Sequence, residues 1–130
     1  PPFADVQALD TEIGRRKRFI QQCMRDSGAT ALVLGISGGV DSLTAGRLAQ
    51  LALEELRASS HDPRYRFMAV RLPHGRQHDE ADAAAAMKFV AADTELTVDI
   101  APPVAAMLKQ IGPLAELPAQ ASDLAAGNVK

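Results

Sequence analysis

Residues 31–42 have the sequence ALVLGISGGVDS, an apolar run followed at once by serines, glycines and an aspartate. The first half, 31–36, is rich in Val, Leu and Ile and shows no polar alternation. This pattern predicts a short strand buried on both faces, as in a parallel sheet. The second half, 37–42, has the composition of a turn. We therefore expect a strand, a glycine-rich turn and then a helix.

Similar patterns flank this unit on both sides. We expect helices over 5–27, 42–57, 79–90 and 102–111, strands over 31–36, 66–72 and 95–100, a loop over 58–64, and a weakly patterned tail over 114–130 with helical character from Gln120. Helices and strands thus alternate, which implies right-handed crossovers and a parallel sheet. The predicted fold class is α/β, in three layers with helices on both faces of the sheet. We expect residues 1–130 to form a single domain.

The composition excludes several classes of protein. The chain has 130 residues, with 14 Lys+Arg against 16 Asp+Glu, and this near-neutral balance argues against nucleic-acid binding. No apolar run approaches the length of a membrane span, so we expect no membrane partner. A single cysteine excludes an intrachain disulfide and favours a reducing compartment, which points to the cytoplasm. Because the chain starts at Pro1 without Met, we expect the native protein to extend beyond it.

The helix over 5–27 has one apolar stripe. Leu9, Ile13, Ile20 and Cys23 lie on this stripe at helical spacing. Cys23 is therefore interpreted as a small core residue rather than as a nucleophile. The basic run over 15–18 is interpreted as a solvated helix face.

The turn over 37–42 is suited to binding an anion. Gly38 and Gly39 lack a Cβ, so the backbone can approach phosphate oxygens and adopt positive φ. Successive N–H groups and the start of the next helix add donors and a positive dipole end, and Ser37 and Ser42 add hydroxyls. Asp41 would repel phosphate unless a cation lies between them, so it predicts Mg²⁺.

Two commoner phosphate loops do not match. A Walker A motif requires a lysine that this turn lacks, and 35–38 does not provide the G-x-G-x-x-G dinucleotide fingerprint. The alternative is a tight turn in which Ser and Asp act only as helix caps. Six residues of this type between a strand and a helix favour the phosphate-binding interpretation.

The SGGVDS sequence over 37–42 matches the SGGxDS pyrophosphate loop of the ATP pyrophosphatase superfamily. That group includes GMP synthetase, asparagine synthetase, argininosuccinate synthetase and several tRNA-modifying ligases. Its members cleave ATP between the α- and β-phosphates and adenylate an acceptor oxygen. The loop alone does not choose among them.

Further blocks resemble the ammonia-dependent NAD synthetase family within this superfamily. They are LVLGI at 32–36, AVRLPHG at 69–75 with Gln77 and Asp79-Glu80 after it, LTVDI at 96–100 and GNVK at 127–130. The resemblance implies a Rossmann-like ATP pyrophosphatase (adenine nucleotide alpha hydrolase-like) fold, incomplete at the C-terminal end, because family members continue well past this point.

The resemblance also implies a set of binding residues. Those expected to bind ATP are Gly35, Ile36, Ser37, Gly38, Gly39, Val40, Asp41 and Ser42, with Arg71, Leu72 and Gln77 close to the nucleotide. Asp41 would hold Mg²⁺, and no side chain is assigned a covalent or acid–base role. Two alternatives stay open: a strand-end salt bridge for Arg71 and a solvated loop position for Gln77.

The function implied by the resemblance is the amidation of deamido-NAD (nicotinate adenine dinucleotide) by ammonia to give NAD. ATP is the co-substrate: it adenylates the nicotinate carboxylate with release of pyrophosphate, and ammonia then displaces AMP. The family acts as a homodimer. Two other interpretations remain: another SGGxDS ligase, for example one like GMP synthetase, and a nucleotide-binding fragment without activity.

Other polar residues give weaker signals. His61, His74 and His78 do not have the spacing of a zinc site. Asp93 and Asp99 are interpreted as surface or capping residues, with support of a nearby site as the alternative.

Overall fold

The computed structural model describes residues 3–75 and 80–112. Its elements are α1 (Val6–Ser27), β1 (Ala31–Gly35), α2 (Val40–Ser60), β2 (Arg66–Arg71), α3 (Glu80–Val90), β3 (Thr94–Thr97) and α4 (Ala101–Ile111). The predicted alternation of helices and strands is confirmed. Gln77, His78, Asp79 and the expected tail helix from Gln120 lie outside the described residues.

The chain forms two compact units. The first comprises Pro1–Leu72 and His78–Val98, and the second comprises Pro73–Gln77 and Asp99–Lys130. The first unit holds α1, α2, α3 and all three strands, and the second holds α4. That residues 1–130 form a single domain stays a prediction.

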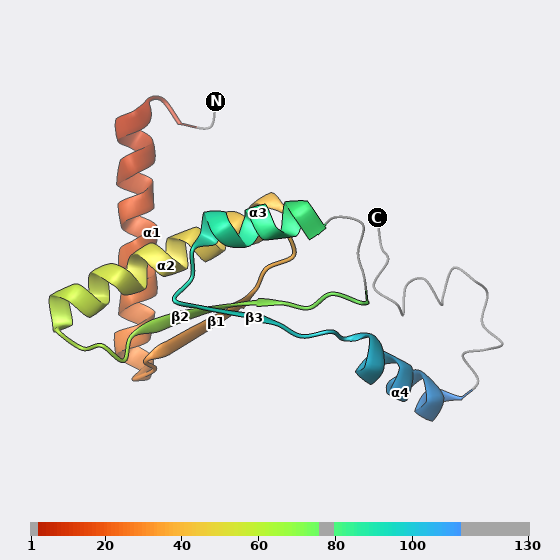
Figure 1. Cartoon of the computed structure of the whole chain (residues 1–130). Coiled ribbons are helices and arrows are strands. Elements are labelled where there is room, and N and C mark those ends of the chain that lie inside the picture. Colours follow the sequence, from red (N-terminus) through yellow and green to blue (C-terminus); the bar gives the residue numbers. More distant parts are fainter. Residues whose placement is uncertain (1–2, 76–79, 113–130) are drawn as a thin grey trace. The chain divides into compact units, whose positions relative to one another are not determined.

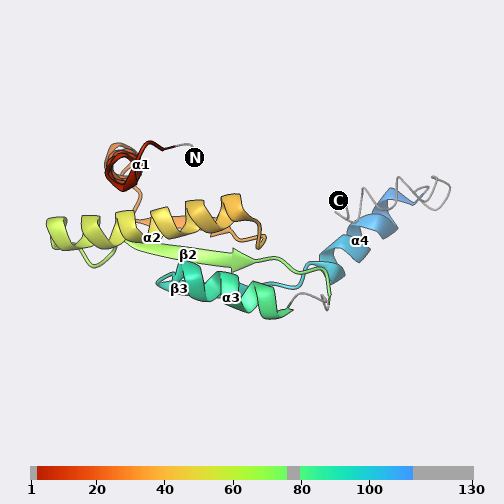
Figure 2. The same cartoon turned by 90° about the horizontal axis from the view of Figure 1, so that it is seen from above.

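The three strands form a parallel sheet in the order β1-β2-β3. Helices α2 and α3 lie side by side on the same face of this sheet (Figure 1), and the view from above shows β2 running between them (Figure 2). Two successive right-handed crossovers that advance in the same direction place both connecting helices on one face. The α/β class with a parallel sheet is therefore confirmed. The prediction of helices on both faces is wrong for the described residues of the first unit, where α2 and α3 cover one face only.

The core lies between this helical layer and the sheet. Phe67 of β2, Leu53 of α2 and Val90 of α3 are its largest fully buried side chains. Smaller residues let the layers approach closely, and a Cβ added at Gly46 would lie 3.0 Å from Ile36 Cδ1 and 3.1 Å from both Val90 Cγ atoms. Gly46 thus brings α2 close to α3 and to the end of β1.

The opposite face of the sheet is apolar but open in the described part of the chain. Val33 is 58% exposed and Leu96 is 43% exposed, while Met68 and Val70 between them are half-buried. The prediction that strand 31–36 is buried on both faces is therefore wrong for this chain. The lack of polar alternation indicates that both faces of a strand are apolar. Helices α2 and α3 bury one of these faces only.

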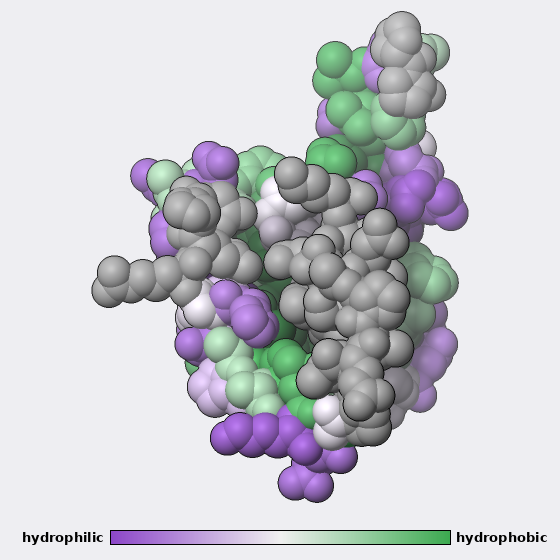
Figure 3. All heavy atoms as spheres, turned by 90° about the vertical axis from the view of Figure 1, so that its right-hand side faces the viewer, coloured by the Kyte–Doolittle hydropathy of each residue, from purple (hydrophilic) through white to green (hydrophobic). Residues whose placement is uncertain are grey.

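Helix α1 packs against α2. Met24 joins the buried core, Gln21 Nε2 donates to the Ala52 carbonyl oxygen at 3.0 Å, and Lys17 pairs with Glu55. Figure 3 shows apolar residues on the first turns of α1, at the top of the view, where Val6 is exposed. The apolar stripe predicted for this helix is only partly covered in this chain, because Leu9 is 38% exposed and Ile13 and Ile20 are half-buried.

Two interpretations of α1 have opposite outcomes. Cys23 is exposed, so its assignment to the core is wrong. Met24 is buried instead, because one step along a helix rotates a side chain by about 100°. In the basic run, Arg15 and Arg16 are solvated as predicted, and both pair with Glu12 on the helix surface. Lys17 is not solvated: its side chain is only 20% exposed and pairs with Glu55 of α2.

Several boundaries differ from the prediction. Helix α2 extends to Ser60, three residues past the predicted end, where the Ser60 hydroxyl donates to the Leu56 carbonyl oxygen at 2.6 Å and His61 adopts a left-handed φ of 56°. Strand β3 ends at Thr97 rather than at Ile100. Its partner β2 ends at Arg71, which leaves little strand for β3 to pair with.

In the second unit, Asp99 has the predicted capping role. Its Oδ1 accepts hydrogen bonds from the N–H groups of Ala101 at 2.9 Å and Gly75 at 3.0 Å. These two bonds hold the pKa of the Asp99 carboxyl below its usual value. Helix α4 then begins with Pro102 and Pro103 in its first turn, where the missing N–H groups cost nothing.

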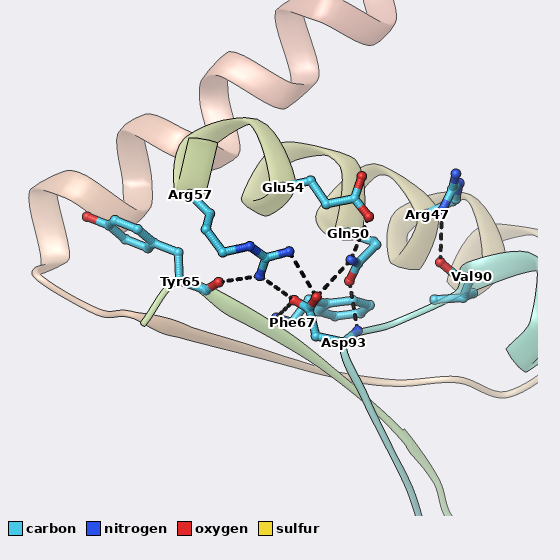
Figure 4. A network of polar contacts seen from close by, with 8 residues as sticks. All are labelled: Arg47, Gln50, Glu54, Arg57, Tyr65, Phe67, Val90 and Asp93. Atoms are coloured by element: carbon cyan, nitrogen blue, oxygen red, sulfur yellow. Dashed lines mark hydrogen bonds and ion pairs between the residues drawn. The ribbon is translucent and has the colours of Figure 1, made fainter. Parts of the chain in front are cut away.

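A polar network ties α2 to the amino ends of β2 and β3 (Figure 4). The Asp93 carboxylate accepts from both terminal nitrogens of Arg57 at 3.0 Å, from the Phe67 N–H at 2.9 Å and from Gln50 Nε2 at 3.2 Å. Arg57 also donates to the Tyr65 carbonyl oxygen at 2.7 Å. Asp93 is only 11% exposed, so the surface role, one of the two expected for it beside capping, is wrong.

We expect Asp93→Asn to destabilise the protein in a pH-dependent way. Burial alone would raise the pKa of Asp93, but the bonds from Arg57, Phe67 and Gln50 lower it from 3.8 to about 2. A carboxyl whose pKa is lowered on folding stabilises the native state above its unfolded pKa and loses that effect as pH falls toward the folded value. The ionised Asp93 carboxylate therefore contributes about 2 kcal/mol to the free energy of unfolding near neutral pH.

Urea unfolding of the wild type and Asp93→Asn at pH 7 and at pH 3 checks this. The stability difference should be largest at pH 7 and should shrink at pH 3. An equal difference at both pH values would contradict the charged role of Asp93.

Candidate functional site

The turn between β1 and α2 begins where the sheet ladder ends. Ile36 is buried, and its N–H donates to the Val70 carbonyl oxygen at 2.8 Å, which extends the pairing of β1 with β2 by one residue. Gly38 follows with φ of +87°, a left-handed conformation that favours glycine. Gly39 is extended and forms the N-cap of α2. The turn therefore rises from the carboxyl end of a strand directly into a helix N-terminus.

Two serine hydroxyls hold this turn in shape. Ser42 Oγ accepts from the Ser37 N–H at 3.2 Å, lies 3.1 Å from Ser37 Oγ and donates to the Gly39 carbonyl oxygen at 3.0 Å. Ser37 Oγ accepts from the Gly39 N–H at 3.3 Å. The sequence predicts these hydroxyls as donors to an anion, and the structure shows them bonded to each other and to the turn itself.

The first turn of α2 keeps its backbone donors available. No side chain caps it, and its first helical bond runs from the Leu43 N–H to the Gly39 carbonyl oxygen at 3.1 Å. The N–H groups of Val40, Asp41 and Ser42 therefore have no partner within the helix. Together with the positive end of a 21-residue helix, they suit a phosphate group.

Asp41 lies in this first turn, and its side chain is exposed. A carboxylate here stabilises the helix through the macrodipole, and it is also a ligand that Mg²⁺ accepts. Within residues 3–75 and 80–112 no three His, Cys, Asp or Glu side chains come together as a metal cluster. The exposed Asp41 carboxylate is chemically suited to contribute one ligand oxygen to a Mg²⁺ ion.

Arg71 ends β2 beside this turn. It directly follows Val70, whose carbonyl accepts the Ile36 N–H. Its side chain is only 13% exposed and pairs with Glu80, the first residue of α3, at 3.3 Å. The strand-end salt bridge considered from the sequence is therefore present. Leu72 is exposed, and Gln77 lies outside the described residues.

Sequence reasoning missed Glu80 as the partner of Arg71. It used Asp79-Glu80 as the start of the helix over 79–90 and as part of the family resemblance, and it named no acidic partner for Arg71. The available signal was the short separation of Arg71 and Glu80 across the connection from β2 to α3. A connection this short places the end of β2 and the start of α3 at the same edge of the sheet. It does not show which acidic side chain pairs with the Arg71 guanidinium.

None of the described helices combines the length and the apolar character that a membrane crossing requires.

Comparison with known proteins gives a consistent result. A family model described as NAD synthase matches residues 12–130. An NH(3)-dependent NAD(+) synthetase of Ectopseudomonas mendocina (strain ymp) is 58% identical over all 130 residues, and one of Pseudomonas aeruginosa (strain LESB58) is 56% identical. In each case the alignment covers 100% of this chain and 47% of the relative. The chain therefore spans about half the length of the curated relatives it matches.

Two solved structures are similar to this one. The NAD+ synthetase of Burkholderia pseudomallei has a TM-score of 0.72 at 50% identity, over 85% of this chain and 38% of that chain. An NH3-dependent NAD synthetase of Campylobacter jejuni has a TM-score of 0.62 at 23% identity, over 78% of this chain and 40% of that chain. The second likeness supports the fold alone.

Proposed function

Because this chain belongs to the NAD synthase family, we propose that the protein containing it converts deamido-NAD to NAD with ammonia and ATP. The observation that carries this proposal is the SGGVDS turn between β1 and α2, with its positive-φ glycine and the donors of an uncapped helix start. The relatives that bear the name NH(3)-dependent NAD(+) synthetase align over the whole chain. They support the choice of this ligase within the superfamily.

The proposed reaction has two steps. The nicotinate carboxylate of deamido-NAD attacks the α-phosphorus of ATP, which forms an acyl adenylate and releases pyrophosphate. Ammonia then attacks the acyl carbon, and AMP leaves. In the first step negative charge accumulates on the departing pyrophosphate, so groups that stabilise that charge accelerate the reaction.

The described residues contribute to the first step by electrostatic positioning. The N–H groups at the start of α2 would donate to the β- and γ-phosphate oxygens, and Gly38 leaves room for the phosphates to approach the backbone. Asp41 would hold Mg²⁺, which when bound neutralises phosphate charge. Arg71 would add a fixed positive charge at the carboxyl end of β2, and Leu72 would lie near the nucleotide. The family resemblance implies a nucleotide contact for Gln77 as well, which lies outside the described residues.

The assembly and setting of the protein are part of the same proposal. The family resemblance supports a homodimer, in which a second copy of the chain helps to form the substrate site. The single cysteine and the near-neutral charge support a cytoplasmic enzyme that does not bind nucleic acid.

A substrate panel on the full-length protein tests the function. AMP release from ATP should require both deamido-NAD and ammonia. Xanthylate, aspartate and tRNA are the matched alternatives for other SGGxDS ligases. AMP release with one of these, and none with deamido-NAD, would overturn the proposal.

Asp41→Asn should lower the rate of AMP formation by roughly two orders of magnitude or more, the scale for loss of one preorganised electrostatic group. The substitution keeps the shape of the side chain and removes its charge. Initial rates over a range of Mg²⁺ concentrations check this, because the variant should need more Mg²⁺ for half-maximal rate. Near-normal turnover would refute the metal role.

Gly38→Val should weaken Mg-ATP binding. A branched Cβ at φ of +87° strains the turn and occupies the space where a phosphate would approach the backbone. Gly28→Val is the matched control, because Gly28 has φ of +70° and lies before β1, at the other end of the strand. Calorimetry with Mg-ATP should show weaker binding for Gly38→Val alone, and equal affinity of the two variants would contradict the proposed phosphate position.

A further inference from the structure

The Arg71 side chain lies on the helix-covered face of the sheet at its carboxyl edge. Phe67 and Ala69, which alternate with it along β2, are fully buried against α2 and α3. The Arg71 side chain is 13% exposed and reaches α3. The turn at 37–39 rises from β1, the neighbouring strand, to α2 on this same face. A largely covered cation and the proposed anion-binding turn therefore share one edge and one face of the sheet.

Glu80 contacts Arg71 with both carboxylate oxygens. Arg71 Nη1 donates to Glu80 Oε2 at 3.3 Å, and Nη2 donates to Oε1 at 3.5 Å. Across residues 3–75 and 80–112 these are the only hydrogen bonds of the Arg71 side chain. A guanidinium has more N–H donors than these two contacts use. The pair therefore orients Arg71 and leaves donors for an anion.

Glu80 is well placed to orient another side chain. It is the first residue of α3, so its backbone is held by a helix rather than by a loop. It is 61% exposed, whereas Arg71 is largely covered, so the carboxylate remains solvated while it restrains the guanidinium. A long arginine side chain that is already ordered loses less entropy when it binds a ligand.

We propose that Glu80 is a positioning residue for the reaction proposed above: it holds the Arg71 guanidinium at the carboxyl edge of the sheet, with its remaining donors directed to the phosphates of ATP. This inference rests on the proposed function, since it requires ATP at the turn between β1 and α2. Glu80 itself touches no substrate. Its effect passes through Arg71 and ends when Arg71 is removed.

A double-mutant cycle in the full-length protein tests the proposal. Glu80→Gln should raise the KM for ATP by roughly three- to tenfold, the scale of ordering one side chain, and should leave kcat within about twofold. Such a pattern indicates loss of binding that is equal in the ground and transition states. In an Arg71→Ala background, Glu80→Gln should change neither KM nor kcat. A merely structural Glu80 would act equally in both backgrounds, and that result would overturn the proposal.

Asp82→Asn is the matched control. Asp82 is the other acidic residue in the first turn of α3, so its loss removes the same charge from the helix N-terminus without touching Arg71. Its KM for ATP should stay at the wild-type value. An equal rise for Asp82→Asn would assign the effect to helix charge, and a fall in KM for Glu80→Gln would show that Glu80 competes with ATP. Either result overturns the proposal.

Calorimetry with Mg-ATP separates this inference from the proposed function. If the wild type binds Mg-ATP but forms no AMP with deamido-NAD, the proposed function fails, and the same cycle in binding constants still tests Glu80. Binding weakened by Glu80→Gln only when Arg71 is present supports the positioning role. If the wild type does not bind Mg-ATP, the positioning role fails as well. Thermal unfolding of each variant confirms that Arg71→Ala and Glu80→Gln retain the fold.

Discussion

The parallel pairing of β1 with β2 is the constraint on which the site depends. Its last bond, from the Ile36 N–H to the Val70 carbonyl oxygen, fixes where β1 stops and where the glycine turn begins. The same bond places Arg71 one residue beyond that point on the neighbouring strand. Right-handed crossovers then bring α2 and α3 to one face, so a helix N-terminus, a cation and its partner Glu80 meet at one edge.

The opposite end of α2 explains how this edge keeps its shape. Asp93 and Arg57 join the second half of α2 to the starts of β2 and β3, away from the turn. Gly46 lets the middle of the helix approach Val90 closely. Helix α2 is thus held by the Arg57–Asp93 bonds near its C-terminus and by packing around Gly46. These contacts fix the position of the N–H donors in its first turn. Buried polar groups that are fully satisfied rigidify a structure in this way.

Local chemistry made much of this predictable, and tertiary contacts account for the rest. Residues 31–42 predict a strand, a turn and a helix because apolar, glycine and capping residues act within a few positions of each other. The burial of Met24 in place of Cys23 could not be predicted, because it depends on which face of α1 packs against the rest of the chain. The exposure of Val33 and the pairing of Arg71 with Glu80 likewise depend on which helices lie on which face of the sheet. Hydrophobic periodicity in the sequence does not contain this information.

The serine bonds within the turn relate the fold to its proposed chemistry. Ser37 and Ser42 satisfy each other and the backbone of the turn, so hydrogen bonds within the turn stabilise its shape. A loop that is ordered in advance loses less conformational entropy on binding. In the proposed reaction, negative charge develops on the leaving pyrophosphate. Backbone N–H donors that are already aligned with that charge lower the reaction barrier most, because they need not reorganise. In the proposed reaction the two hydroxyls would therefore assist without donating to the substrate, because their bonds hold the turn that leads into the amides at the start of α2.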